Sequence, residues 1–98
     1  MIMEVAELTI QPGTEAEFEA AVAKAAPLFL RARGCHGLSL QKVIETPNIY
    51  RLRVVWETVE NHMVDFRSSE DFQGWRGLVG GFFAAPPSVT HETEVSRF

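Results

Sequence analysis

Residues 37–56 read GLSLQKVIETPNIYRLRVVW, and this stretch predicts a β-hairpin. In residues 37–45, and again in residues 49–56, apolar side chains alternate with polar ones, which is the period of a half-buried strand. The linker Thr46-Pro47-Asn48 is short, so the two strands are expected to pair antiparallel. An antiparallel sheet is therefore expected in the middle of the chain.

Each strand of this hairpin has one apolar side. The apolar side comprises Leu38, Leu40, Ile44, Leu52, Val54 and Trp56. We expect these side chains to face helices of the same chain. The opposite side carries Gln41, Arg51 and Arg53, and water or a polar partner surface has to cover it.

Two further strands are expected at the ends of the chain. One parity of residues 2–10 is apolar except at Glu4, and its apolar members are Ile2, Ala6, Leu8 and Ile10. In residues 88–96, His91 shares its parity with Val89 and Val95. Alternation along a strand therefore directs the His91 side chain toward the helices.

Two segments show the spacing of helices, one between the first strand and the hairpin and one between the hairpin and the last strand. Thr14 and Glu17 fit a capping box, and the helix that follows is expected to kink or restart at Pro27. A second helical region is expected to be capped by Thr58. It is expected to break where Ser68 marks a new helix start.

The resulting order, β-α-β-β-α-β, predicts an α+β fold of the ferredoxin-like, split βαβ type. It has a four-stranded antiparallel sheet with the helices on one face. The 98 residues correspond to a single domain, residues 1–98. The other sheet face would be bare in a monomer, and an uncovered face of mixed polarity predicts a face-to-face homodimer.

Charge and cysteine content disfavour several classes of protein. The net charge is −4 and the nine Lys and Arg residues are scattered, which argues against nucleic-acid binding. No apolar run approaches the ~20 residues of a membrane span, and the N-terminus lacks signal-peptide features. Cys35 is the one cysteine, so no internal disulfide can form and a reducing compartment is expected. We therefore expect a cytoplasmic protein that binds neither nucleic acid nor membrane.

Aromatic, histidine and arginine residues follow one another in a recognisable order through the second half of the chain. They are Trp56, His62, Phe66-Arg67-Ser68, Phe72, Trp75-Arg76, Phe82, Pro87 and His91. This order and spacing, within the expected β-α-β-β-α-β arrangement, resembles the antibiotic biosynthesis monooxygenase domain over nearly the whole chain. The resemblance implies a dimeric α+β barrel, in which two ferredoxin-like sheets pack together. Each subunit of that barrel keeps a pocket between its sheet and its helices.

The resemblance also implies an activity, oxygenation without a cofactor. Polyphenolic substrates of the family lose a proton, the anion passes one electron to O2, and recombination followed by loss of water gives a quinone. The sequence contains no GxGxxG, P-loop or CxxC motif. The expected partners are a second copy of the chain, a small hydrophobic or aromatic substrate and O2, with no cofactor.

Other branches of the family suggest alternatives. A haem-degrading branch has Asn on the first strand, Trp on the middle helix and His on the following helix. The matching positions here are Glu7, Phe66 and Arg76, so all three depart from that pattern. Related branches process signalling molecules or isomerise lactones and ketoses. An isomerase and a non-catalytic small-molecule-binding dimer therefore stay open as alternatives.

Three polar residues are candidates for catalysis. His62 or His91 would bind or deprotonate a phenol, because the ordinary pKa of histidine suits that work. Asn61 would hold an oxyanion or O2 through its amide. The structural alternatives are two histidines bonded within the core and an asparagine that points to solvent. Glu7 is a further candidate base on the first strand.

Six residues are candidates for substrate binding, namely Trp56, Phe66, Phe72, Trp75, Phe82 and Arg76. The aromatic side chains would hold a flat ring, although large aromatics at such spacing also form cores. Arg76, like Arg67, would stabilise an enolate or pair with a surface carboxylate.

A metal site is not expected. Cys35 and His36 are adjacent, and neighbouring strand residues point to opposite faces. There is no second cysteine for a structural zinc site. A site made of His36, His62 and His91 would need three distant elements to meet.

Overall fold

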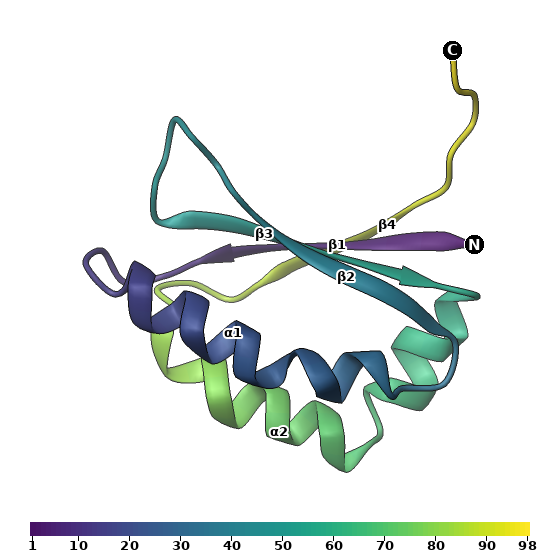
Figure 1. Cartoon of the computed structure of the whole chain (residues 1–98), viewed down its shortest axis with the longest axis horizontal. Helices are drawn as coiled ribbons and strands as arrows, with labels where there is room; N and C mark the ends of the chain where they lie inside the picture. The colour runs from purple at the N-terminus through teal and green to yellow at the C-terminus, as the bar shows by residue number, and fades with distance from the viewer.

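The elements follow one another in the expected β-α-β-β-α-β order, with the second helical region divided into pieces. A computed structural model describes all 98 residues of the chain (Figure 1). The strands are β1 (Ile2–Thr9), β2 (Cys35–Lys42), β3 (Ile49–Trp56) and β4 (Ser88–Glu92). The helices are α1 (Glu15–Leu30), the π-helix η1 (Asn61–Phe66), α2 (Glu70–Val79) and the 3₁₀ helix η2 (Gly80–Phe82).

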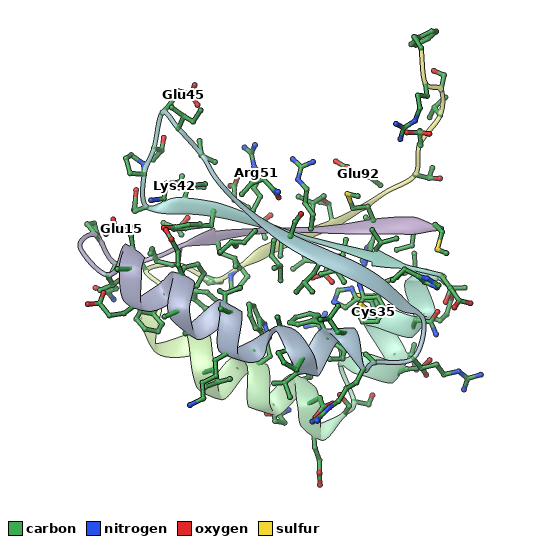
Figure 2. The ribbon with its side chains drawn as sticks, viewed as in Figure 1. Glu15, Cys35, Lys42, Glu45, Arg51 and Glu92 are labelled. Atoms are coloured by element: carbon green, nitrogen blue, oxygen red, sulfur yellow. The ribbon has the colours of Figure 1, made fainter.

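The strands form one antiparallel sheet in the order β2-β3-β1-β4. The α+β, ferredoxin-like class is therefore confirmed. The helices α1 and α2 cover one face of the sheet, and the other face is free in the single chain (Figure 1). Arg51 and Glu92 extend from that free face, away from the helices (Figure 2). The homodimer itself stays a prediction.

The hairpin is confirmed, but its first strand ends earlier than expected. Strand β2 stops at Lys42, and Ile44 is 87% exposed in the connecting loop. The backbone explains the difference, because Val43 N donates to Ile49 O at 2.9 Å and closes the ladder there. Ile44 therefore belongs to the turn, and its expected place on the apolar side is wrong.

The core lies between the sheet and the helices. On β3 the expected apolar parity is buried, and its members Tyr50, Leu52, Val54 and Trp56 are each 0–1% exposed. The helices contribute Phe18, Val22, Ala25, Phe29, Phe66, Trp75 and Val79. On β1 the buried parity is that of Ala6 and Leu8, and it includes the charged residue Glu4.

For α1, the expected capping bond is wrong, and so is a restart at Pro27. The Thr14 hydroxyl makes no capping bond to the helix but donates to Gln11 O at 2.6 Å. At φ −107° and ψ 15°, Thr14 lacks the extended backbone that directs a capping hydroxyl at the helix. Pro27 does not make the helix restart, because α1 runs through it to Leu30. Lying so near the C-terminal end, Pro27 interrupts few helical hydrogen bonds.

The start of the second helical region is confirmed, and its restart is displaced by one residue. Asn61 N donates to Thr58 Oγ1 at 3.1 Å, so Thr58 caps this region. The cap of α2 is Ser69, whose Oγ accepts from Phe72 N at 3.2 Å, and not Ser68. Ser69 has the extended backbone of a cap, with φ −92° and ψ 159°.

The last strand is shorter than the expected residues 88–96. Strand β4 ends at Glu92, which pairs with Met3. The pairing of β4 with β1 goes no further, and the residues that follow Glu92 have no strand partner. Val95 is accordingly 92% exposed, and the C-terminal end leaves the sheet (Figure 1). No helix combines the length and apolar character needed to cross a membrane.

Candidate functional site

The carboxyl group of Glu4 lies inside the protein, between the sheet and the helices. Glu4 occupies the parity of β1 that faces the helices, and it is 4% exposed. Its Oε1 accepts a hydrogen bond from Trp56 Nε1 at 3.0 Å. A carboxyl buried without such a bond would cost several kcal/mol (~2–7). Trp56 of β3 therefore makes a buried acid tolerable at this position.

His62 is the second polar group of the site. It belongs to η1, is 4% exposed, and holds its Nε2 3.3 Å from Glu4 Oε1. Its ring stacks on Trp56, with ring centroids 5.5 Å apart and an interplanar angle of 17°. The π-helical winding of η1 fits this placement, since π-turns are frequent at functional sites.

His91 extends this row of polar contacts. It lies on β4 directly opposite Glu4 of β1, and its Nε2 is 2.9 Å from His62 Nδ1. When His62 donates through Nε2 to the Glu4 carboxylate, its Nδ1 must accept, and His91 must then donate through Nε2. Groups from three separate elements thus form one connected row, His91–His62–Glu4.

Burial shifts the pKa values of Glu4 and His62 in the directions that favour their neutral forms. Loss of hydration raises the pKa of Glu4 to about 7, although the Trp56 hydrogen bond and the charge of Arg67 oppose this. Loss of hydration lowers the pKa of His62 to about 4, and the charges of His91 and Arg67 act in the same direction. At pH 5 to 6 the contact of Glu4 with His62 therefore joins two neutral groups, and near pH 7 Glu4 begins to carry charge.

Glu4 and His62 form part of the wall of a cavity of about 380 Å³. Much of the remaining wall is apolar. It includes Ala6, Leu8 and Leu52 from the sheet, and Phe72, Trp75 and Phe83 from the helical side. A mostly apolar cavity with a few polar groups is the usual form of a small-molecule site, and this one lies at the lower end of the ~300–1,000 Å³ range.

Two arginines complete the cavity wall. The guanidinium carbons of Arg67 and Arg76 lie over the ring of Phe72, 5.6 and 5.9 Å from its centroid. Neither arginine forms an ion pair with a carboxylate of the chain. Both are exposed, whereas Glu4 and His62 are buried. The cations therefore stand at the mouth of the cavity and the carboxyl group at its inner end.

Half of the residues expected to bind substrate line this cavity, namely Phe72, Trp75 and Arg76. Trp56 is completely buried and reaches the site only through Glu4 and His62.

Two of the expected substrate-binding residues are packed elsewhere. Phe66 lies against Phe29, with ring centroids 4.7 Å apart, and Phe82 lies against Phe18 at 5.9 Å. These contacts place Phe66 and Phe82 in the packing of the core, so their expected place on the cavity wall is corrected.

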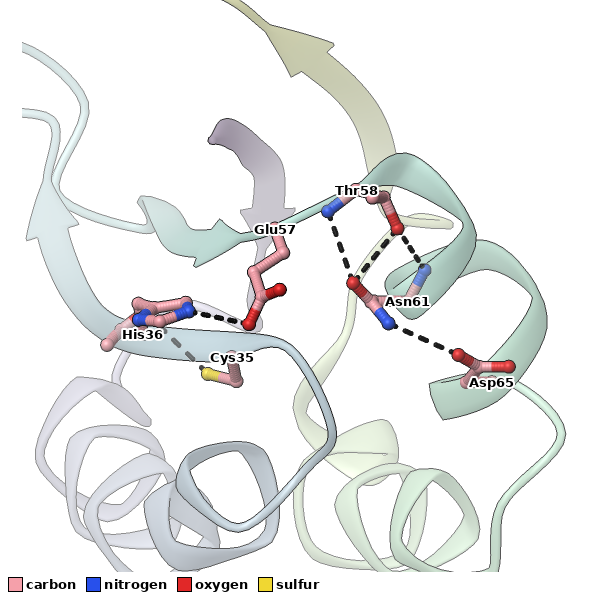
Figure 3. Close-up of polar contacts among 7 residues, drawn as sticks. Cys35, His36, Glu57, Thr58, Asn61 and Asp65 are labelled. Carbon is pink, nitrogen blue, oxygen red and sulfur yellow. Dashed lines mark hydrogen bonds and ion pairs between the residues drawn. The ribbon is translucent and has the colours of Figure 1, made fainter.

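Asn61 does not line the cavity either. Its Oδ1 accepts from Thr58 N at 3.2 Å and from Thr58 Oγ1 at 2.9 Å. Its Nδ2 donates to Asp65 at 3.2 Å (Figure 3). Both ends of the amide are thus occupied at the outer turn of η1, and this corrects the expected position of Asn61 in the site.

Cys35 and His36 lie apart from the row of His91, His62 and Glu4. His36 is exposed, and its Nε2 is 2.9 Å from Glu57 Oε2 (Figure 3). Cys35 is half-buried, and loss of hydration raises the pKa of its thiol. No group of three or more His, Cys, Asp or Glu side chains is placed to hold a metal ion.

Glu4 is the site residue that sequence reasoning missed. The signal was available, because Glu4 is the one charged residue on the apolar parity of β1. Glu7, the candidate base, lies on the opposite face and pairs with Arg51 at 3.2 Å. The two positions differ in parity along the strand, so their side chains point to opposite faces.

Comparison with known proteins identifies the family of the chain. The family model described as antibiotic biosynthesis monooxygenase matches residues 1–78. The chain belongs to this family. The uncharacterized protein YczJ of Bacillus subtilis (strain 168) is 40% identical over 95 residues, which are 97% of this chain and 100% of that protein.

Solved structures of the family resemble the chain as well. A Bordetella bronchiseptica protein with the same family designation is 62% identical, with a TM-score of 0.95 and 97% of each chain covered. SnoaB of Streptomyces nogalater, described as a cofactor-independent oxygenase and solved in a mutant form, is 20% identical. Its TM-score is 0.82, with 98% of this chain and 94% of that chain covered. At this identity the likeness to SnoaB shows a shared fold alone.

Proposed function

We propose that this member of the family is a cofactor-independent monooxygenase, which oxidises a small hydroxylated aromatic compound with O2. The observation that carries the proposal is Glu4. It is a buried carboxyl group with a pKa of about 7 on the wall of a largely apolar cavity. A base with a pKa near the working pH is well suited to proton transfer.

Glu4 is the proposed base. Its Oε1 is occupied by Trp56 and His62, whereas Oε2 has no hydrogen-bond partner in the chain. Oε2 is therefore the oxygen free to accept a proton from a bound hydroxyl group. With a pKa of about 7, Glu4 is partly ionised near neutral pH, and its ionised form can accept that proton.

His62 and His91 are proposed as positioning residues. With its pKa lowered to about 4, His62 is a weak base at neutral pH. As a neutral donor it can instead hold the Glu4 carboxylate in one orientation, and His91, when it donates to Nδ1, keeps the hydrogen of His62 on Nε2. The candidate base therefore moves from the histidines to the carboxyl group that they support.

The reaction needs only the substrate and O2. Proton transfer to Glu4 leaves an electron-rich aromatic anion, which the positive charge of Arg67 stabilises. The anion passes one electron to O2, and the resulting radical pair combines into a peroxide at a ring carbon. The ring carbon then gives up its one hydrogen atom and keeps one oxygen atom as a carbonyl group. The other oxygen atom leaves as water with the proton that Glu4 had accepted, and the former hydroxyl oxygen becomes the second carbonyl group of a quinone.

The cavity also bears on the size of the substrate. A volume of about 380 Å³ suits a compound of one or two rings better than a multi-ring polyketide. Trp75 and Phe72 offer flat aromatic surfaces for such rings. The apolar wall excludes water, which strengthens the effect of each polar group on the anion.

Oxygen uptake by the purified, metal-free protein tests this proposal. The panel holds naphthols, hydroquinones and anthrones, with no added cofactor. Uptake above the autoxidation rate is expected, together with a loss of at least ~100-fold in Glu4→Gln. Glu7→Gln removes a carboxyl group from the other face of the same strand and should keep its rate within about twofold of the parent.

The alternatives predict different outcomes. An absence of oxygen uptake with every compound would contradict the oxygenase proposal and leave an isomerase or a binding protein as the alternatives. Uptake that survives Glu4→Gln would remove Glu4 as the base. Circular dichroism of both variants shows whether they fold.

A further inference from the structure

The cavity has different polar groups at its two ends. Glu4 and His62 are each 4% exposed and form the inner end. Arg67 and Arg76 are exposed and stand at the mouth, both over the ring of Phe72. A ligand that fills the cavity therefore meets a proton acceptor with one end and guanidinium groups with the other.

The charges of Arg67 and Arg76 differ in their effect on Glu4 and His62 at the inner end of the cavity. The charge of Arg67 lowers the pKa of both Glu4 and His62, whereas Arg76 contributes to neither shift. Arg67 thus lies within electrostatic reach of the reacting end, whereas the charge of Arg76 is not engaged with either group there. Arg76 also has no carboxylate partner in the chain, so its guanidinium is available to a ligand.

We propose that Arg76, with Phe72 beside it, is an anion subsite that selects a hydroxylated aromatic acid. The hydroxyl group of this substrate would enter first and reach Glu4, and its carboxylate would stay at the mouth on Arg76. A planar guanidinium can bind a carboxylate through two parallel hydrogen bonds, and the neighbouring phenyl ring can pack against the aromatic ring of the ligand. This inference rests on the proposed function for the hydroxyl end alone.

Calorimetric titration of the full chain with two matched ligands tests the subsite. One ligand is 6-hydroxy-2-naphthoate, which has a hydroxyl and a carboxylate at opposite ends, and the other is 2-naphthol, which lacks the carboxylate. The acid is expected to bind at least ~10-fold more tightly, since hydrogen bonds to charged groups exceed neutral ones. Added salt should weaken the binding of the acid, because salt screens its contact with an arginine at the exposed mouth of the cavity. It should leave the binding of 2-naphthol nearly unchanged.

Variants of the arginine assign the effect to one residue. Arg76→Gln should remove most of the preference for the acid, and Arg76→Lys should restore part of it, because lysine keeps the charge without the planar fork. Arg33→Gln is the matched control, since Arg33 is an exposed arginine in the loop between α1 and β2. It should leave the preference unchanged.

Several outcomes would overturn the subsite. They are equal binding of the two ligands, no binding of the acid, and a preference that survives Arg76→Gln. Binding needs no turnover, so the result is separate from that of the oxygen-uptake assay. Arg76-dependent binding of the acid without oxygen uptake supports the subsite and counts against the oxygenase. Oxygen uptake with hydroquinones, together with equal binding of the two ligands, supports the oxygenase and counts against the subsite.

Discussion

His62 Nδ1 and His91 Nε2 lie 2.9 Å apart and join η1 to β4. The two residues are 29 positions apart in the chain. When His91 donates through Nε2, the hydrogen of a neutral His62 lies on its Nε2, the nitrogen that is 3.3 Å from Glu4 Oε1. The geometry therefore ties the state of a buried carboxyl group to a strand at the edge of the sheet.

Removing His91 should raise the pKa of His62. The charge of His91 is the second cause that lowers this pKa, after loss of hydration. In His91→Ala both causes weaken, because the smaller side chain also admits water. Titration by NMR of the histidine ring signals measures the change. An unchanged or lower pKa for His62 would contradict the arrangement.

Glu4 should make the protein less stable as the pH rises from about 4.5 to 7. In this range the unfolded chain releases the Glu4 proton, whereas the folded chain, with a pKa of about 7, retains it. The folded state binds more protons, so the free energy of unfolding falls with rising pH, by up to ~1.4 kcal/mol per pH unit. Urea unfolding of the parent and of Glu4→Gln measures this. The difference between them should shrink from pH 4.5 to 7, and a constant difference would contradict a raised pKa.

His62 should have the opposite effect. Between about pH 4 and 6.5 the unfolded chain binds a proton at His62, whereas the folded chain, with a pKa of about 4, does not. The stability contributed by neutral His62 is therefore lost as the pH falls through this range, again by up to ~1.4 kcal/mol per pH unit. In the same urea experiment, the difference between the parent and His62→Gln should grow as the pH rises. Glu7→Gln, with its carboxyl on the other face, is the control for both series.

Ser69 and Ser68 offer a matched pair for the start of α2. Ser69 Oγ accepts from Phe72 N, and Ser69 Oγ also donates to Phe66 O at 2.6 Å. We expect Ser69→Ala to lower the free energy of unfolding by about 1 kcal/mol, which is the usual cost of losing a cap. Ser68 is exposed, and Ser68→Ala should stay within about 0.5 kcal/mol of the parent. Equal effects of the two variants would show that Ser69 is not the cap.

The free face of the sheet should bind a second copy of the chain. Arg53 Nε is buried there without a hydrogen-bond partner, and Arg51 pairs with Glu7. A self-complementary partner surface would satisfy Arg53 and cover Val5. Light scattering at micromolar concentration should therefore give twice the chain mass of 11.0 kDa.

A charge on that face should separate the copies. Val55→Glu is expected to give a monomer, because Val55 lies on that face opposite Met3 and Gly37, so the new carboxylate has no cation directly across from it in the interface. Val64→Glu adds the same charge at a position that is 58% exposed on η1, and it should stay dimeric. A monomeric parent protein would contradict the predicted dimer.

Local periodicity predicted the fold well. Alternation placed Leu52 and Val54 in the core, and it turned His91 toward the helices, because the face of a strand residue depends only on its parity. The ends of the elements were less predictable. Strand β4 stops where its pairing with β1 ends, and the cap of α2 is the serine with an extended backbone. Both depend on neighbours that are distant in sequence.

For the site, the order of residues alone was enough to establish the inward parity of Glu4, the histidines of the second half, and membership of the family. The folded chain was needed to show that Glu4, Trp56, His62 and His91 meet, because the strand order β3-β1-β4 sets their three strands side by side. Burial among those elements then shifts the two pKa values in opposite directions. Hydration is lost through neighbours that are far away in the chain, and a linear pattern of residues does not contain that information.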